Sequence, residues 1–135
     1  MISIYLHKTN PIYLYAEITD AVVCEDIHYW EEVFLQTLDK TKPKRIIIFN
    51  YTGAFLQENK YYIESAKVAT RTGKYVSKAV YIGLVGIQKY FFQLYKTLLP
   101  KHAVPQPLYD SVSELEHTES LLITDFILYK TNKKG

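Results

Sequence analysis

Three side chains with metal-ligand character stand near the start of a predicted helix. Glu25, His28 and Glu32 occupy positions i, i+3 and i+7, which places them on one helical face. A zinc ion needs about four ligands that converge from different directions, and one helix supplies only part of such a set. Acidic residues also stabilise a helix N-terminus without any metal. We therefore predict no metal site, and we expect no cofactor.

The only cysteine, Cys24, is the one candidate thiol nucleophile. It follows the apolar run 21–23, a setting that raises the pKa of a thiol and leaves it unreactive. Neither His102 nor His117 has a partner that the sequence identifies, and no Gly-x-Ser-x-Gly motif is present. We therefore expect a protein that is not an enzyme.

Gly83 and Gly86 bracket a short segment that resembles part of a phosphate-binding loop. The segment lacks the third glycine of a dinucleotide fingerprint and the Lys-Ser/Thr pair of a P-loop. Glycine also permits a tight turn from strand to helix, and we prefer that interpretation. One alternative stays open, because Gly86 precedes a helix N-terminus whose free N–H groups favour anions.

A cluster of cations and one aromatic residue, Arg71, Lys74, Tyr75 and Lys78, has the composition of single-strand nucleic-acid binders. The same residues fit a solvated helix end and loop. The net charge of the chain is only +2, so we predict no nucleic-acid partner.

Length and composition indicate one domain with a real core. The chain has 135 residues, of which 48% are hydrophobic. A single cysteine fits a reducing compartment. His7 and Lys8 interrupt the apolar stretch that an N-terminal leader would need. No stretch of 18 residues is apolar enough to span a membrane. We expect a soluble cytoplasmic protein. The 13 tyrosines fit half-buried positions or a surface that meets a partner.

Apolar segments at 45–50 and 78–83 predict strands buried on both faces, each followed by helical spacing. Ile27, Trp30 and Phe34 form one helical stripe after an N-cap at Asp26. Gly73 is expected as a left-handed helix end. The predicted strands are 2–6, 12–18, 45–50, 78–83 and 102–109; the predicted helices are 26–38, 57–72, 87–98 and 112–122, with a loop at 19–25 and a turn at 51–53; and the stripe expected to face the core at 87–98 is Ile87, Phe91, Leu94, Tyr95 and Leu98.

Two segments are expected at the margins of the sheet. Pro105 and Pro107 cannot donate to a strand ladder, which predicts an edge strand at 102–109. Residues 125–129 fit either a short extra strand or a docked extension, and 130–135 are expected to fray. The predicted domain is therefore 1–122, followed by an extension at 123–135.

Three segments, 46–53, 79–86 and 108–115, give the chain a resemblance to STAS domains. Each is similar to a strand-and-turn or helix start of the SpoIIAA-like members, the STAS/SEC14-like group of small bacterial proteins, and the resemblance covers 12–122. It implies a single α/β domain with a mixed, mostly parallel sheet, an N-terminal β-hairpin and about four helices. It also implies a non-enzymatic regulatory or protein-interaction module.

The chain departs from the family at its regulatory turn. Members that switch by phosphorylation carry an Asp-Ser-Ser-Gly-type turn before the second helix, whereas 54–61 contains no Ser or Thr here. The resemblance therefore implies the scaffold without the usual phosphorylatable serine. Thr52 lies just before this region, and Asn50 stands where members often have Asp.

Ligands of open α/β sheets usually meet the loops after the strands, which points to the end of the 45–50 strand. The resemblance indicates the same surface, and an unknown protein is the expected partner. The predicted binding residues are Asn50, Thr52, Gly53, Glu58, Asn59 and Tyr62. The alternative is a lipid or nucleotide site between sheet and helices, lined by Tyr81, Tyr90, Phe91 and Tyr95. An exposed strand edge could also support a homodimer.

Overall fold

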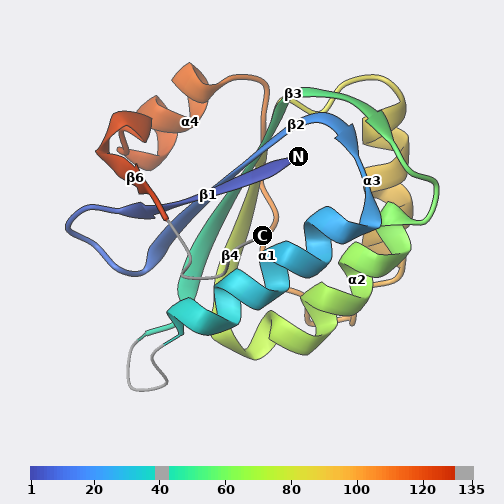
Figure 1. Ribbon diagram of the computed structural model, residues 1–135, viewed down its shortest axis with the longest axis horizontal. Coiled ribbons are helices and arrows are strands. Elements are labelled where there is room, and N and C mark those ends of the chain that lie inside the picture. Colours follow the sequence, from blue (N-terminus) through green and yellow to red (C-terminus); the bar gives the residue numbers. More distant parts are fainter. Residues whose placement is uncertain (39–42, 130–135) are drawn as a thin grey trace.

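The computed structural model describes residues 1–38 and 43–129, which form one mixed sheet with helices on both faces (Figure 1). The described strands are β1 (Ile2–His7), β2 (Tyr13–Val22), β3 (Arg45–Gln57), β4 (Val76–Ile82), β5 (Leu108–Tyr109) and β6 (Phe126–Leu128). Their order in the sheet is β5-β4-β3-β2-β1-β6. The first two strands form the predicted N-terminal hairpin, β2 to β5 run parallel, and β6 pairs antiparallel with β1.

The helices cover the two faces of the sheet unequally. Helices α1 (Cys24–Thr37), α2 (Tyr61–Thr72) and α3 (Ile87–Thr97) lie on one face, and α4 (Val112–Glu119) lies on the other (Figure 1). Side chains alternate along β3, so Phe49 packs on Trp30 of α1, whereas Ile48 joins the cluster that contains Leu115 of α4. The predicted fold class, a mostly parallel mixed sheet with an N-terminal hairpin and about four helices, is confirmed.

Helix α1 has the predicted core stripe but a different start. Ile27, Trp30 and Phe34 are all buried, as their spacing predicted. Asp26, however, is not the N-cap. Val23 occupies that position, and the Asp26 carboxylate accepts a hydrogen bond from the Val23 N–H at 3.1 Å, which satisfies one free donor of the helix start.

The predicted turn at 51–53 is wrong, because β3 continues to Gln57. The predicted loop at 19–25 is wrong for the same reason, since β2 extends to Val22 and pairs with β3 through two irregularities in register. Beyond Asn50, β3 pairs only with β2, because β4 ends at Ile82. A two-stranded ribbon therefore extends past the main sheet, and α2 begins only at Tyr61 rather than at 57.

Two details of the later helices also differ from prediction. Gly73 has a right-handed φ of −55° and leads into a 3-10 turn (η1, Gly73–Tyr75), so the left-handed helix end is wrong. Helix α3 buries Gln88, Phe92 and Tyr95, while Ile87 is 64% exposed. Of the stripe predicted for α3, Tyr95 is buried as expected, whereas Gln88 and Phe92 are buried in place of Ile87 and Phe91, a displacement of one residue or about 100°.

Gln88 explains that rotation. Its amide Nε2 donates to the Ala54 carbonyl at 2.9 Å, and its Oε1 accepts from the Val85 N–H at 3.2 Å. A polar side chain that satisfies two backbone groups can face inward, which periodicity of apolar residues does not anticipate.

Both marginal segments join the sheet. The carbonyls of Pro105, Pro107 and Tyr109 accept the N–H groups of Ala79, Tyr81 and Gly83 at 3.0–3.1 Å. The two prolines thus supply acceptors only, and of the edge strand predicted at 102–109 only Leu108–Tyr109 is a strand. After a second 3-10 turn (η2, Ile123–Asp125), β6 adds to β1 and buries Phe126. The predicted fraying of 130–135 lies outside the described residues. No helix within the described residues is long and apolar enough to cross a membrane.

Candidate functional site

A cavity of about 90 Å³ lies between the three-helix face of the sheet and helices α2 and α3. Its walls are mostly apolar and aromatic, with Trp30 and Phe49 on one side and Phe91 on another. Four buried tyrosines from different elements also line it, and we call it the tyrosine cavity: Tyr51 of β3, Tyr61 of α2, Tyr81 of β4 and Tyr95 of α3.

The four tyrosine hydroxyls are paired across the sheet–helix boundary. The hydroxyls of Tyr51 and Tyr61 lie 2.8 Å apart, and that of Tyr81 donates to Tyr95 at 3.1 Å. Each pair joins a strand to a helix, so the polar groups enter the core already satisfied. The arrangement fixes α2 and α3 on the sheet at the point where the cavity lies.

The cavity carries no charge at neutral pH. Burial raises the pKa of Tyr61 to about 12 and that of Tyr51 and Tyr81 well above the usual tyrosine range. Burial also raises the pKa of Tyr95. The hydroxyls therefore remain protonated, and they can exchange hydrogen bonds with a ligand but cannot serve as bases near pH 7.

Two polar atoms in the cavity wall lack hydrogen-bond partners among the described residues: Ser65 Oγ and Gln106 Oε1. Burial raises the pKa of Tyr61 and of Tyr95, and the neighbouring Ser65 and Gln106 side chains, within reach of these hydroxyls, partly lower the two pKa values again. Neither unpartnered atom, however, makes a hydrogen bond of normal geometry. Buried polar atoms are rarely left in this state, so an occupant with polar atoms would complete the site.

A second candidate site is a groove that lies between the middle of β2 and β3 and the start of α4, beside the ends of β4 and β5, and we call it the polar groove. It is lined by Glu17, Thr19, Asn50, Thr52, Gly53 and the residues 110–113. Its position is the carboxyl end of parallel strands, where α/β folds commonly bind ligands. Ser111 caps α4 by accepting from the Glu114 N–H at 3.2 Å.

The predicted binding residues divide between separate parts of the molecule. Asn50, Thr52 and Gly53 lie together in the polar groove. Asn50 is already committed, since its Nδ2 donates to Tyr15 Oη at 2.8 Å and its Oδ1 accepts from the Thr52 N–H at 2.9 Å. Thr52 and Gly53 are exposed.

The other three predicted residues lie farther along the chain. The added stretch of β3 from Asn50 to Gln57 spans about 23 Å of strand. Glu58 Oε2 accepts from the Cys24 N–H at 2.7 Å, and this hydrogen bond lowers the pKa of Glu58. Asn59 is exposed ahead of α2, and Tyr62 lies against Phe91 in the wall of the tyrosine cavity.

The alternative pocket predicted from the sequence is close to the observed cavity. Tyr81, Phe91 and Tyr95 line it as expected, whereas Tyr90 is 61% exposed and points elsewhere. The prediction missed Tyr51 and Tyr61. Tyr51 shares the strand face of Ile47 and Phe49, a signal that was available once β3 is allowed to continue past Asn50.

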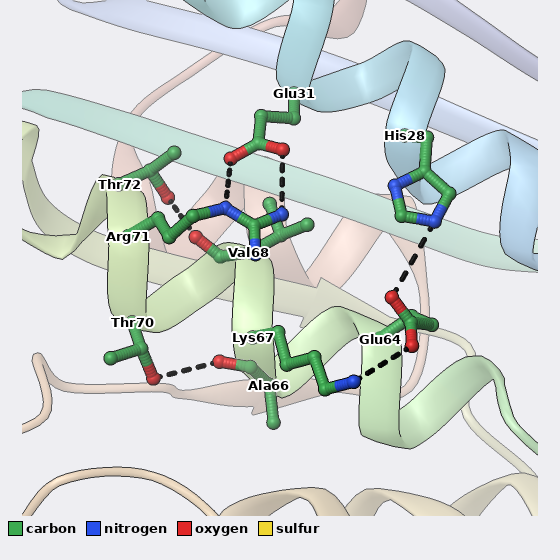
Figure 2. A network of polar contacts seen from close by, with 9 residues as sticks. All are labelled: His28, Glu31, Glu64, Ala66, Lys67, Val68, Thr70, Arg71 and Thr72. Carbon is green, nitrogen blue, oxygen red and sulfur yellow. Dashed lines mark hydrogen bonds and ion pairs between the residues drawn. The ribbon is translucent and has the colours of Figure 1, made fainter.

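The remaining candidate residues serve structural contacts. His28 and Glu31 of α1 reach across to Glu64 and Arg71 of α2, as Figure 2 shows. Burial and the neighbouring Glu58 raise the pKa of Cys24 to about 11, which keeps the thiol protonated. Within the described residues, no three His, Cys, Asp or Glu side chains are grouped so that they could hold a metal.

The chain is similar in structure to an uncharacterised protein of the DUF3478 family from Shewanella loihica PV-4, whose crystal structure has a SpoIIAA-like fold. The match has a TM-score of 0.62 at 15% identity and covers 84% of this chain and 89% of the other. No protein-family model and no curated protein matches the chain. The chain therefore has the SpoIIAA-like, STAS-type fold that its sequence predicted. The neighbour itself indicates no function.

Proposed function

We propose that this SpoIIAA-like domain is a non-enzymatic regulatory module that binds a small uncharged molecule in the tyrosine cavity. The observation that carries the proposal is the pair of unpartnered atoms, Ser65 Oγ and Gln106 Oε1, in the wall of that cavity. An unmade hydrogen bond in a protein interior costs stability, and a ligand with matching polar atoms would remove the cost.

The walls define the chemistry of the ligand. Aromatic rings and aliphatic side chains favour an apolar body, while Ser65 and Gln106 favour one or two polar atoms at its edge. A charged group would enter a site whose four tyrosines are uncharged and buried, which is unfavourable without a counter-charge. The ligand class is therefore a small neutral molecule such as an aromatic or alicyclic alcohol.

The size of the cavity adds a condition. At about 90 Å³ it is smaller than a site for a drug-sized ligand. The rings of Tyr62 on α2 and Phe91 on α3, 5.6 Å apart, meet between the two helices. Anything larger than a few non-hydrogen atoms requires α2 and α3 to separate at this contact, which would couple ligand binding to a change in surface shape.

The test uses phenol and cyclohexanol as probes. Both are expected to raise the melting temperature and to change the emission of Trp30, the only tryptophan and a wall residue. Ala69→Phe, which fills the cavity, should abolish both responses, whereas Ala103→Phe at an exposed position should preserve them. Absence of any response in the unmodified chain, or an undiminished response in Ala69→Phe, would contradict the proposal.

A second candidate function, docking of a protein partner, rests on the polar groove. Exposed Thr52 and Gly53 lie there beside the start of α4, at the carboxyl ends of the strands. Once a partner has been isolated, Thr52→Ala should weaken its binding. Asn59→Ala should weaken it as well only if the surface extends to the start of α2. If neither variant changes the affinity, the polar groove is not the docking site.

A further inference from the structure

A large apolar surface remains uncovered around the exposed side of α3. Six large apolar side chains there are 50–66% exposed: Phe55, Leu56, Val85, Ile87, Tyr90 and Leu98. The Gln88 hydrogen bond to the Ala54 carbonyl holds the end of β3 beside the first turn of α3, so these residues belong to neighbouring segments. Ile87, Tyr90 and Leu98 also share one helical face, at i, i+3 and i+11. We call the surface that these six residues form the α2–α3 face.

The same part of the chain is strongly cationic. Residues 65–109 contain seven of the 16 Lys and Arg residues and none of the 14 Asp and Glu residues. The net charge of +2 hides this asymmetry, because every acidic residue lies elsewhere in the chain. Segregated positive charge indicates an anionic partner.

Most of these cations are not used in internal ion pairs. Arg71 pairs with Glu31 of α1 and Lys67 pairs with Glu64 of its own helix, as Figure 2 shows, and Lys78 pairs with Glu119. No carboxylate of the described residues lies within 4.0 Å of the ammonium groups of Lys74, Lys89, Lys96 or Lys101. Lys74 and Lys96 lie over the rings of Tyr75 and Phe92, so all four ammonium groups keep their charge available to an external anion.

We propose that the α2–α3 face docks on the surface of an anionic phospholipid bilayer. A bilayer offers phosphate charge and hydrocarbon side by side, so it satisfies the lysines and the apolar side chains together. Nucleic acid would pair with the lysines but leave Val85, Ile87 and Leu98 in water. Lys89 and Lys96 lie on the opposite flank of α3 from Ile87, two and nine positions after it in the helix, and long lysine side chains can extend from a flank to the headgroups while the apolar residues enter the interface. The proposal does not depend on a ligand in the tyrosine cavity.

The test is co-sedimentation with vesicles of phosphatidylcholine alone and of phosphatidylcholine mixed with phosphatidylglycerol. The full chain should bind the mixed vesicles, bind the neutral ones weakly, and dissociate as salt is raised. Ile87→Asp should lower the partition coefficient by about tenfold or more. An acid in the first turn of α3 favours the helix, so this variant should stay folded.

Two matched variants separate docking from general effects. Ile127→Asp changes the same residue type at a similar exposure, 61% on β6, and should bind like the unmodified chain. Lys74→Glu should weaken binding by about fivefold or more, whereas Lys44→Glu, with the same change in charge, should weaken it less. Equal effects of Ile87→Asp and Ile127→Asp would overturn the proposal. Failure of the unmodified chain to bind the mixed vesicles would also overturn it. If the chain is instead a dimer in light scattering and Ile87→Asp is a monomer, this face is a dimer interface and the proposal is wrong.

Discussion

Ser65 and Ser111 place the same hydroxyl group in opposite surroundings. Ser111 Oγ accepts the N–H of Glu114 and so satisfies a free donor at the start of α4. Ser65 Oγ is buried without a hydrogen bond of normal geometry. The two hydroxyls therefore differ in what they contribute to the stability of the fold.

We predict that Ser65→Ala leaves the free energy of unfolding unchanged or raises it by up to about 1 kcal/mol, because a buried hydroxyl without a partner is removed. Ser111→Ala should lower it by about 1 kcal/mol through loss of the cap. Urea denaturation followed by circular dichroism measures both. A Ser65→Ala variant that loses as much stability as Ser111→Ala would show that the Ser65 hydroxyl is already satisfied in the free protein.

At the scale of elements, two glycines have contrasting roles next to β4. Gly83 has φ of +76°, and a Cβ atom there would lie 2.4 Å from Thr52 Oγ1. Gly73 has an ordinary helical φ of −55°, and a Cβ atom would meet nothing within 4 Å. Only the first glycine is required by the way β3 passes the end of β4.

Gly83→Ala should therefore destabilise the chain by about 2 kcal/mol or more, because alanine is strained at this positive φ and its Cβ atom would clash with Thr52. Gly73→Ala should stabilise it by about 0.4–1 kcal/mol by restricting the unfolded chain. Thermal denaturation of the two variants decides the matter. A stable Gly83→Ala variant would mean that β3 does not run beside the Gly83 turn as described.

The contact between α1 and α2 includes a two-point ion pair. Arg71 Nε and Nη2 donate to the two carboxylate oxygens of Glu31 at 2.9 and 2.8 Å (Figure 2). Hydrogen bonding from Arg71 lowers the pKa of Glu31 below its usual value of 4.5. The pair's contribution to stability is thus present above pH 4.5 and is lost as the pH falls through the lowered pKa.

A double-mutant cycle with Glu31→Gln and Arg71→Met should give a coupling of about 0.5–1 kcal/mol at pH 7, because Arg71 is half exposed and water screens the pair. The coupling should shrink in high salt and vanish well below pH 4. Denaturation at several pH values and salt concentrations measures it. A coupling that survives in acid would assign it to packing rather than to charge.

Sequence periodicity predicted the helices better than it predicted the ribbon. Ile27, Trp30 and Phe34 lie in the core, as the apolar spacing along α1 predicted. The stripe of α3 was displaced because Gln88 faces inward on backbone hydrogen bonds that no apolar pattern reveals. The turn expected at 51–53 fails because a pairing with β2, distant in sequence, overrides the local preference of a Thr-Gly pair.

For the whole molecule, β6 links the last part of the described chain to the first strand. Phe126 is buried against Tyr15 and the α4 side, whereas its neighbour Ile127 is 61% exposed. Phe126→Ala should cost about 3 kcal/mol through the cavity it leaves. Ile127→Ala should change stability by no more than about 0.5 kcal/mol. Similar losses in urea denaturation would show that β6 does not cover that face.

The fold was predictable as a whole, but the candidate site was predictable only in part. Alternating strands and helices, with the quoted segments, indicated the STAS-type scaffold that the structural comparison confirms. The predicted binding residues, however, lie in different places, because their grouping assumed a turn after Asn50. Of the residues that line the tyrosine cavity, the sequence predicted Tyr81, Phe91 and Tyr95, but it missed Tyr51 because the turn expected at 51–53 ended its strand too early.

The central claim, a small neutral ligand in the tyrosine cavity, is tested most directly by native mass spectrometry of the purified chain, followed by the same sample denatured. We predict extra mass that is retained in the native spectrum, lost on denaturation, and absent from Ala69→Phe but present in Ala103→Phe. A bare native chain that also takes up neither phenol nor cyclohexanol would contradict the account, as would extra mass that Ala69→Phe retains in full.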